Sequence, residues 1–144
     1  MEKIILERLT YYLNSNDLLS IVQYGFKRGH STADQILYFG QRVRDSQNLR
    51  PSHHTVAVFL DLSKAFDRVW RNKLIIKLFN TFGIRDRALS WIFDFLKDRE
   101  IRVRFRDSLS KTFRLSQGVP QGSVLSPLLF PYTLRALRKS SLEV

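Results

Sequence analysis

The sequence predicts an α+β fold, because helical and strand patterns are mixed along the chain without a steady alternation of the two. Apolar residues recur at helical spacing over residues 3–13, 31–43, 71–82 and 89–96. Five consecutive apolar residues within the segment 55–62 indicate a strand buried on both faces. Strict alternation of apolar residues with arginine over 101–106 predicts a second, half-buried strand.

Local signals mark the ends of several helices. Ser31 and Asp34 have the spacing of a capping box, which starts the second helix. Gly83 follows the last apolar position of the third helix and predicts its end. Ser126 followed by Pro127 has the pattern of an N-cap and a first helical residue, so a further helix is predicted to begin there.

The connections between these elements are polar or rich in glycine. Residues 14–30 and 45–54 are predicted to be irregular. The segment 107–110 is predicted to turn the alternating strand back into a partner strand over 112–115, and 116–123 forms a loop. The expected architecture is therefore a central strand and a β-hairpin packed by helices.

The charge of the chain points to a polyanionic partner. A length of 144 residues fits one domain, and the net charge is +11 with a pI near 10.4. Nucleic acid is the first partner that such an excess indicates, and charge that only aids solubility is the alternative. No apolar stretch approaches the roughly 20 residues that span a membrane. The absence of cysteine excludes disulfides and thiolate metal sites.

Asp61 is the first candidate for chemistry, since the predicted buried strand ends on its carboxylate. A carboxylate in that position suits Mg²⁺, and a buried, hydrogen-bonded structural Asp is the alternative. A two-metal site needs several carboxylates, so Asp61 requires partners from elsewhere. Asp67 is predicted to be an N-cap or turn residue, and Phe66 either a core aromatic or the wall of a substrate pocket.

Two further groups of residues are candidates for binding. Gln121 lies in the glycine-containing loop and could hydrogen-bond a nucleotide or a base edge, although a structural turn is an equal possibility. Arg102, Arg104 and Arg106 share one face of their predicted strand by the period of two. Such a row could follow a phosphate backbone, or it could be a solvated face that protects a sheet edge.

Three segments resemble motifs of one known family. Residues 57–69 read AVFLDLSKAFDRV and resemble motif A of reverse transcriptases from non-LTR, jockey-like retrotransposons. Residues 116–130 read SQGVPQGSVLSPLLF and are similar to motif B of these enzymes. Residues 23–32, QYGFKRGHST, resemble the upstream fingers–palm motif. The order and spacing agree, and the resemblance covers about residues 3–130.

The resemblance implies a fingers/palm fragment of a right-hand polymerase. Asp61 would bind catalytic Mg²⁺, and the backbone carbonyl of Leu62 would add a ligand. The partners would be an RNA template, a DNA primer and deoxynucleoside triphosphates. The implied reaction is attack of the primer 3′-hydroxyl on the α-phosphate of the incoming nucleotide. Oligomeric state and localisation are not indicated.

The remaining roles also follow from the resemblance alone. Phe66 would be the steric gate that excludes a ribose 2′-hydroxyl. Gln121 and Gly122 would line the nucleotide pocket. Lys27 and Arg28 would contact the triphosphate or the template.

The chain departs from the family after motif B. Family members continue into a hairpin with two adjacent Asp residues, whereas no Asp follows Asp107 here. The Arg-containing fingers segment that would precede Met1 is also absent. We therefore expect a partial reverse transcriptase domain over 1–130, a divergent tail over 131–144 and no polymerase activity from the chain alone. A strand at 55–62 without that hairpin would leave an apolar edge, which predicts low solubility or a need for partners.

Two other classes of function compete with this interpretation. A non-catalytic nucleic-acid-binding module would use the same basic surface. A phosphotransferase with Asp61 as nucleophile is the other, but the haloacid-dehalogenase pattern requires a second Asp two positions later, where this chain has Ser63.

Overall fold

The structure is a computed structural model that describes residues 1–51 and 53–134. Its helices are α1 (Glu2–Ser15), α2 (Thr32–Asn48), α3 (Arg71–Asn80), α4 (Asp86–Leu96) and α5 (Ser126–Leu134). Its short strands are β1 (Glu100–Ile101), β2 (Arg104–Phe105), β3 (Ser108–Leu109) and β4 (Phe113–Arg114). This mixture of helices and a small sheet confirms the α+β class. The chain folds as two compact units, one of Met1–Leu18 with the chain from Lys64 onward, the other Leu19–Ser63.

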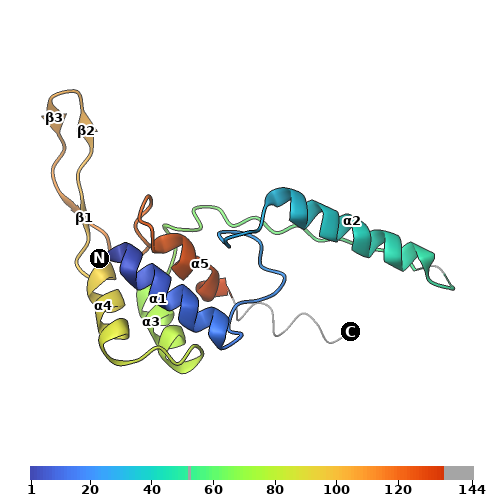
Figure 1. Ribbon diagram of the computed structural model, residues 1–144. Helices are drawn as coiled ribbons and strands as arrows, with labels where there is room; N and C mark the ends of the chain where they lie inside the picture. Colours follow the sequence, from blue (N-terminus) through green and yellow to red (C-terminus); the bar gives the residue numbers. More distant parts are fainter. Residues whose placement is uncertain (52, 135–144) are drawn as a thin grey trace. The chain divides into compact units, whose positions relative to one another are not determined.

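The first unit has a hydrophobic core among α1, α3, α4 and α5 (Figure 1). Its fully buried apolar side chains lie at the positions where the sequence predicts apolar stripes and in the chain around α5: Leu13, Leu74, Leu78, Phe82, Ile92, Leu96, Leu125 and Leu129. The Phe82 ring packs edge-on against Tyr132, with centroids 4.5 Å apart. The Tyr12 hydroxyl donates to the Phe82 carbonyl at 3.1 Å, which ties α1 to the chain after α3.

The predicted helix ends in this unit agree with the structure to within a few residues. Gly83 adopts a φ of 66°, which lets the chain leave the helix direction after α3. α5 begins at Ser126, as the Ser126–Pro127 pattern predicts. Its first amide is capped by a different hydroxyl, however, because Ser123 Oγ accepts from Ser126 N at 3.0 Å.

The hairpin differs from the sequence prediction in two ways. Its tight turn is Arg106–Asp107, and Ser108 and Leu109, which were also predicted to turn, form β3 instead. Arg106 has a φ of 51°, as the first position of tight hairpin turns requires. The strand predicted as half-buried is interrupted and exposed, with Phe105 exposed to 71%. The reason is that the hairpin extends away from the helices of its unit, so neither face is covered (Figure 1).

The second unit contains α2 and the irregular segments on either side of it. The predicted capping box is confirmed, since Asp34 N donates to Ser31 Oγ at 3.2 Å and Ser31 N donates to Asp34 Oδ2 at 2.7 Å. The helix continues to Asn48, so the loop predicted from residue 45 begins later. No residue of α2 is buried.

The predicted buried strand over 55–62 is not formed. The segment is extended but belongs to no sheet, and Val58 and Leu60 are exposed to 78% and 86%. A strand requires a neighbouring backbone, and no described residue pairs with this segment. Its ring contact with α2 joins Phe59 to Phe39 at 6.0 Å, where the segment runs back along the helix (Figure 1). The expected central strand is therefore absent from the described residues.

In the part of the chain that the structure describes, no helix has the length and apolar character needed to cross a membrane. Most of the predicted tail over 131–144 lies outside the described residues, apart from 131–134 in α5. The domain boundary at residue 130 stays a prediction.

Candidate functional site

Two backbone hydrogen bonds join the turn before α3 to the loop before α5. Gly118 N donates to the Val69 carbonyl at 2.8 Å, and Val119 N donates to the Phe66 carbonyl at 2.9 Å. Val69 and Val119 are buried at this contact. Residues 64–71 and 115–123 therefore form one arrangement within the first unit, called the turn–loop junction below.

Gly118 is required by this close approach of two backbones. Its φ is +85°, a conformation that favours glycine. A Cβ atom at this position would lie 2.8 Å from the Asp67 carbonyl oxygen and 3.0 Å from the Asp67 Cα. Backbone atoms cannot move aside as a flexible side chain could, so any other residue would separate the loop from the turn.

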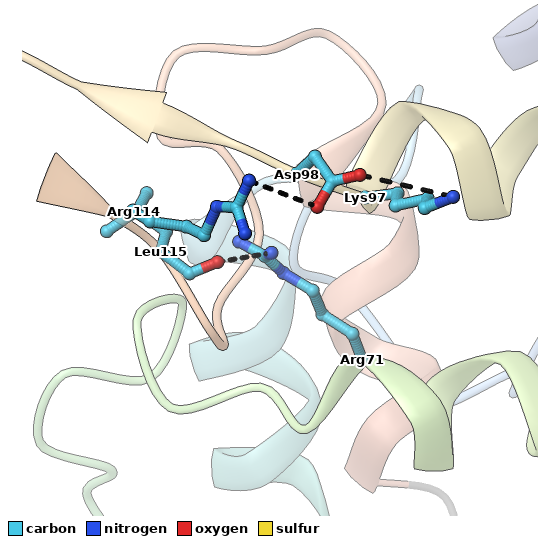
Figure 2. Close-up of polar contacts among 5 residues, drawn as sticks. All are labelled: Arg71, Lys97, Asp98, Arg114 and Leu115. Carbon is cyan, nitrogen blue, oxygen red and sulfur yellow. Dashed lines mark hydrogen bonds and ion pairs between the residues drawn. The ribbon is translucent and has the colours of Figure 1, made fainter. Parts of the chain in front are cut away.

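Arg71 fixes the path of the loop through three carbonyl oxygens. Its Nε donates to Gly118 O at 2.7 Å, and its two terminal nitrogens donate to Leu115 O at 2.7 Å and Gln117 O at 3.0 Å. The bond to Leu115 is visible in Figure 2. Burial, and secondly the charge of Arg99, lower the pKa of Arg71. A guanidinium still stays protonated at neutral pH, so these are charge-assisted hydrogen bonds.

A cavity of about 240 Å³ lies beside Arg71, between the start of α3, the end of α4 and β4. Asp98 lines this cavity and lies 4.0 Å from Lys97 Nζ and 4.0 Å from an Arg114 terminal nitrogen (Figure 2). These side chains are more than half exposed. At that distance and exposure the two ion pairs add little stability.

Gln121 and Asp67 hold the far end of the loop. Gln121 Nε2 donates to Asp67 Oδ1 at 2.8 Å, and both residues are exposed. Asp67 is thus a turn residue, one of its two predicted roles. It does not cap α3, whose N-cap position is Trp70 and has no side-chain cap bond.

Phe66 extends the junction to α5. Its half-buried ring stacks on Phe130, with centroids 4.8 Å apart and planes 23° apart. Gly122 has a φ of +83°, and a Cβ there would meet no atom within 4 Å. The predicted residues Phe66, Gln121 and Gly122 therefore belong to one folded unit.

Asp61 and Leu62 are placed in the second unit, at the end of the extended segment. Both residues are exposed. Among residues 1–51 and 53–134, no group of three His, Cys, Asp or Glu residues is close enough together to hold a metal ion. The donor set around Asp61 therefore does not fit the two-Mg²⁺ site that the resemblance implies.

Lys27 and Arg28 lie in the loop before α2, also in the second unit. Lys27 is half-buried and Arg28 is exposed. The loop is held by local contacts: His30 N donates to the Lys27 carbonyl at 3.2 Å, and the rings of Tyr24 and His30 meet edge-on at 5.1 Å.

Arg102, Arg104 and Arg106 are exposed on the hairpin, but they are not one continuous row. Arg102 Nε donates to Thr112 Oγ1 at 2.6 Å, and Arg104 Nε donates to the Arg106 carbonyl at 3.2 Å. Arg106 lies in the turn, so the prediction that all three share a strand face is wrong for it. The reason is that the tight turn begins one residue earlier than the sequence pattern predicts.

The sequence interpretation did not single out Arg71. One signal for Arg71 was available, since it starts α3 without an acidic residue in the first turn. A cation at a helix N-terminus opposes the helix dipole, which indicates a role other than helix stability.

The sequence matches the model of the family described as "Reverse transcriptase (RNA-dependent DNA polymerase)" over residues 1–143. The chain therefore belongs to the reverse transcriptase family, of the type carried by non-LTR retrotransposons. The resemblance of the chain to this family is confirmed. No solved structure matches the chain.

The similar curated proteins are polymerases of Drosophila transposons. The chain is 36% identical over 129 residues to the probable RNA-directed DNA polymerase from transposon BS of Drosophila melanogaster. It is 31% identical over 129 residues to that of the X-element and 31% identical over 133 residues to the RNA-directed DNA polymerase from mobile element jockey, both of the same organism. Each match covers 90% of this chain but 14% of the relative, so the chain spans about one seventh of these proteins.

Proposed function

We propose that the chain supplies the motif A and motif B portion of an RNA-directed DNA polymerase, the fingers/palm region of a right-hand fold. Its partners there are an RNA template, a DNA primer and deoxynucleoside triphosphates. The observation that carries this proposal is the turn–loop junction. It joins the end of motif A to motif B through the Gly118–Val69 and Val119–Phe66 hydrogen bonds.

The junction is suited to position a nucleotide. Phe66 is held by its stack on Phe130, and Gln121 by its hydrogen bond to Asp67. A ring fixed in this way can exclude a ribose 2′-hydroxyl, because it cannot swing aside at low cost. The exposed Gln121 and the open backbone at Gly122 would contact the sugar or base of the nucleotide.

Asp61 and the Leu62 carbonyl are proposed as ligands of Mg²⁺ in the intact polymerase, since reverse transcriptases are in general Mg²⁺-dependent. The described residues do not supply the other carboxylates that such a site needs. We therefore propose that the 144-residue polypeptide does not polymerise by itself. Lys27 and Arg28 are proposed as contacts to the triphosphate or the template.

The test is a chimaera of the jockey polymerase in which the 133 matching residues are replaced by those of this chain. Primer extension on an RNA template with Mg²⁺ should be retained and should be lost in Asp61→Asn. Asp94→Asn is the matched control, since Asp94 is exposed on α4. Activity that survives Asp61→Asn would contradict the proposal.

A second candidate is a nucleic-acid-binding module without catalysis, which the exposed arginines of the hairpin favour. This alternative predicts salt-dependent binding by the isolated chain together with an inactive chimaera. Templated synthesis by the isolated chain would contradict both the module and the inactivity proposed above.

A further inference from the structure

The two halves of the hairpin are paired in different registers. At its base, Glu100 is opposite Arg114 and Ile101 is opposite Phe113. At its tip, Arg104 is opposite Leu109. Two residues separate Ile101 from Arg104, whereas three separate Leu109 from Phe113. The second strand therefore contains one extra residue, a β-bulge within 110–112.

The position of the bulge follows from the bonds around it. Ser110 N donates to the Val103 carbonyl at 2.9 Å, and Val103 N donates to Ser110 Oγ at 2.9 Å, so Ser110 still keeps the register of the tip. The extra residue is thus at Lys111–Thr112, opposite Arg102. The bond from Arg102 Nε to Thr112 Oγ1 places these two side chains on the same face.

The bulge sorts the side chains onto two faces. Residues directly opposite each other in a hairpin share a face. In the register of the tip, Phe113 would be opposite Glu100; the bulge moves it opposite Ile101 and brings Arg114 opposite Glu100. One face then carries Ile101, Val103, Phe105 and Phe113, and the other carries Arg102, Arg104 and Arg114 with Glu100 and Leu109.

The second of these faces, called the basic face below, has a large excess of positive charge around it. Residues 99–114 contain six Arg or Lys and two Asp or Glu. In the part of the chain that the structure describes, Arg114 is the one cation among them with an ion pair, at 4.0 Å to Asp98. The hairpin extends from its unit, so these charges are accessible to a large partner (Figure 1).

We propose that the basic face binds the phosphodiester backbone of nucleic acid through Arg102, Arg104 and Arg114, and that the bulge places Arg114 for this contact. Guanidinium groups match phosphate oxygens in geometry, and arginines at alternate strand positions are about 7 Å apart. A bulge also increases the twist of a two-stranded ribbon, the form that fits a duplex groove. The choice of nucleic acid rests on the proposed function.

The test measures the salt dependence of binding of the 144-residue chain to labelled RNA–DNA heteroduplex, duplex DNA and single-stranded RNA. The triple variant Arg102→Gln, Arg104→Gln, Arg114→Gln should lower the slope of log K against log salt by about 2.7 on duplex DNA, which corresponds to three lost phosphate contacts. The triple variant Arg8→Gln, Lys73→Gln, Arg87→Gln removes the same charge from exposed helix positions and should change the slope little. Equal effects of the two triple variants, or no binding by the unaltered chain, would overturn the inference.

A second pair of variants tests the bulge itself. Deletion of Thr112 removes the extra residue at unchanged net charge and should lower the slope by about 0.9, since Arg114 leaves the basic face. Thr112→Ala keeps the bulge and should bind as the unaltered chain does. An unchanged slope after the deletion would contradict the role of the bulge. The jockey chimaera tests the polymerase function separately. If the chimaera is active but the two triple variants change the salt slope equally, the role of the basic face is rejected and the proposed function stands.

Discussion

Arg71 Nε donates a hydrogen bond of 2.7 Å to the carbonyl of Gly118, 47 positions further along the chain. Together with its bonds to Leu115 and Gln117, this contact makes the path of the motif B loop depend on the first residue of α3. The loop is thus positioned by the segment that follows motif A, which gives the two motifs a direct physical connection.

Arg71→Met should lower the free energy of unfolding by about 2–3 kcal/mol, because three carbonyl oxygens, two of them in part-buried contacts, lose a charged donor. Arg71→Lys should recover only part of this loss. An ammonium group restores the positive charge, but it cannot reach all three oxygens as the fork of the guanidinium does. Urea denaturation measures both. The control is Arg68→Met at an exposed position of the same turn. Equal losses at the two positions would contradict the role of Arg71.

The variants Gly118→Ala and Gly122→Ala distinguish the free-energy cost of backbone strain from the cost of a steric clash. Both glycines have φ near +85°, but only the Gly118 Cβ would meet the Asp67 backbone. Gly122→Ala should cost about 1–2 kcal/mol, the price of a left-handed alanine. Gly118→Ala should cost about 1–3 kcal/mol more, because its Cβ also forces the backbones apart. Thermal unfolding compares the two, and similar melting temperatures would show that the loop is not docked on the turn.

The capping box of α2 predicts a response to acid. The hydrogen bond from the Ser31 hydroxyl, and secondly from its backbone N–H, holds the pKa of Asp34 below the ordinary value. The stabilising contribution of the Asp34 carboxylate is therefore complete above the ordinary pKa of Asp and is lost as the pH falls through the lowered pKa of Asp34. Ser31→Ala should move the titration of Asp34 and the fraying of the first turn to higher pH. NMR titration of the Asp34 carboxyl carbon tests this, and an unshifted titration in the unaltered chain would contradict it.

Exposure of the segment 55–62 predicts that its apolar side chains contribute little to the stability of this chain. Val58→Lys with Leu60→Lys should raise solubility and change the free energy of unfolding by less than about 0.5 kcal/mol. Leu78→Ala in the core should cost about 2–5 kcal/mol. A lysine variant as unstable as Leu78→Ala would mean that the segment is buried in the folded chain.

The features that the sequence predicted well depend on residues close together in the chain. Ser31 and Asp34 form their box within one helical turn, and Gly83 ends its helix by its own backbone conformation. The apolar stripes of α1, α3 and α4 were predicted for the same reason, because the period of apolar residues fixes the buried face of these helices. The stripe predicted on α2 is not buried.

The features that were missed depend on distant partners. The apolar run ending at Asp61 has the composition of a buried strand, but a strand forms only against another backbone, and no described residue provides one. The alternation over 101–106 indicated a strand that runs through Arg106, whereas the bulge and the turn at Arg106 depend on cross-strand register. The carbonyl contacts of Arg71 could not be predicted from spacing along the chain.

We propose that the turn–loop junction forms the nucleotide-binding surface of an RNA-directed DNA polymerase. Its most direct test is the ratio of ribonucleotide to deoxynucleotide incorporation by the jockey chimaera with Phe66→Ala. We expect this ratio to rise by about 10- to 100-fold, because the ring that we propose to face the sugar is removed. Phe79→Ala, at a partly exposed position of α3, should leave the ratio unchanged. An active Phe66→Ala chimaera with an unchanged ratio would contradict the claim.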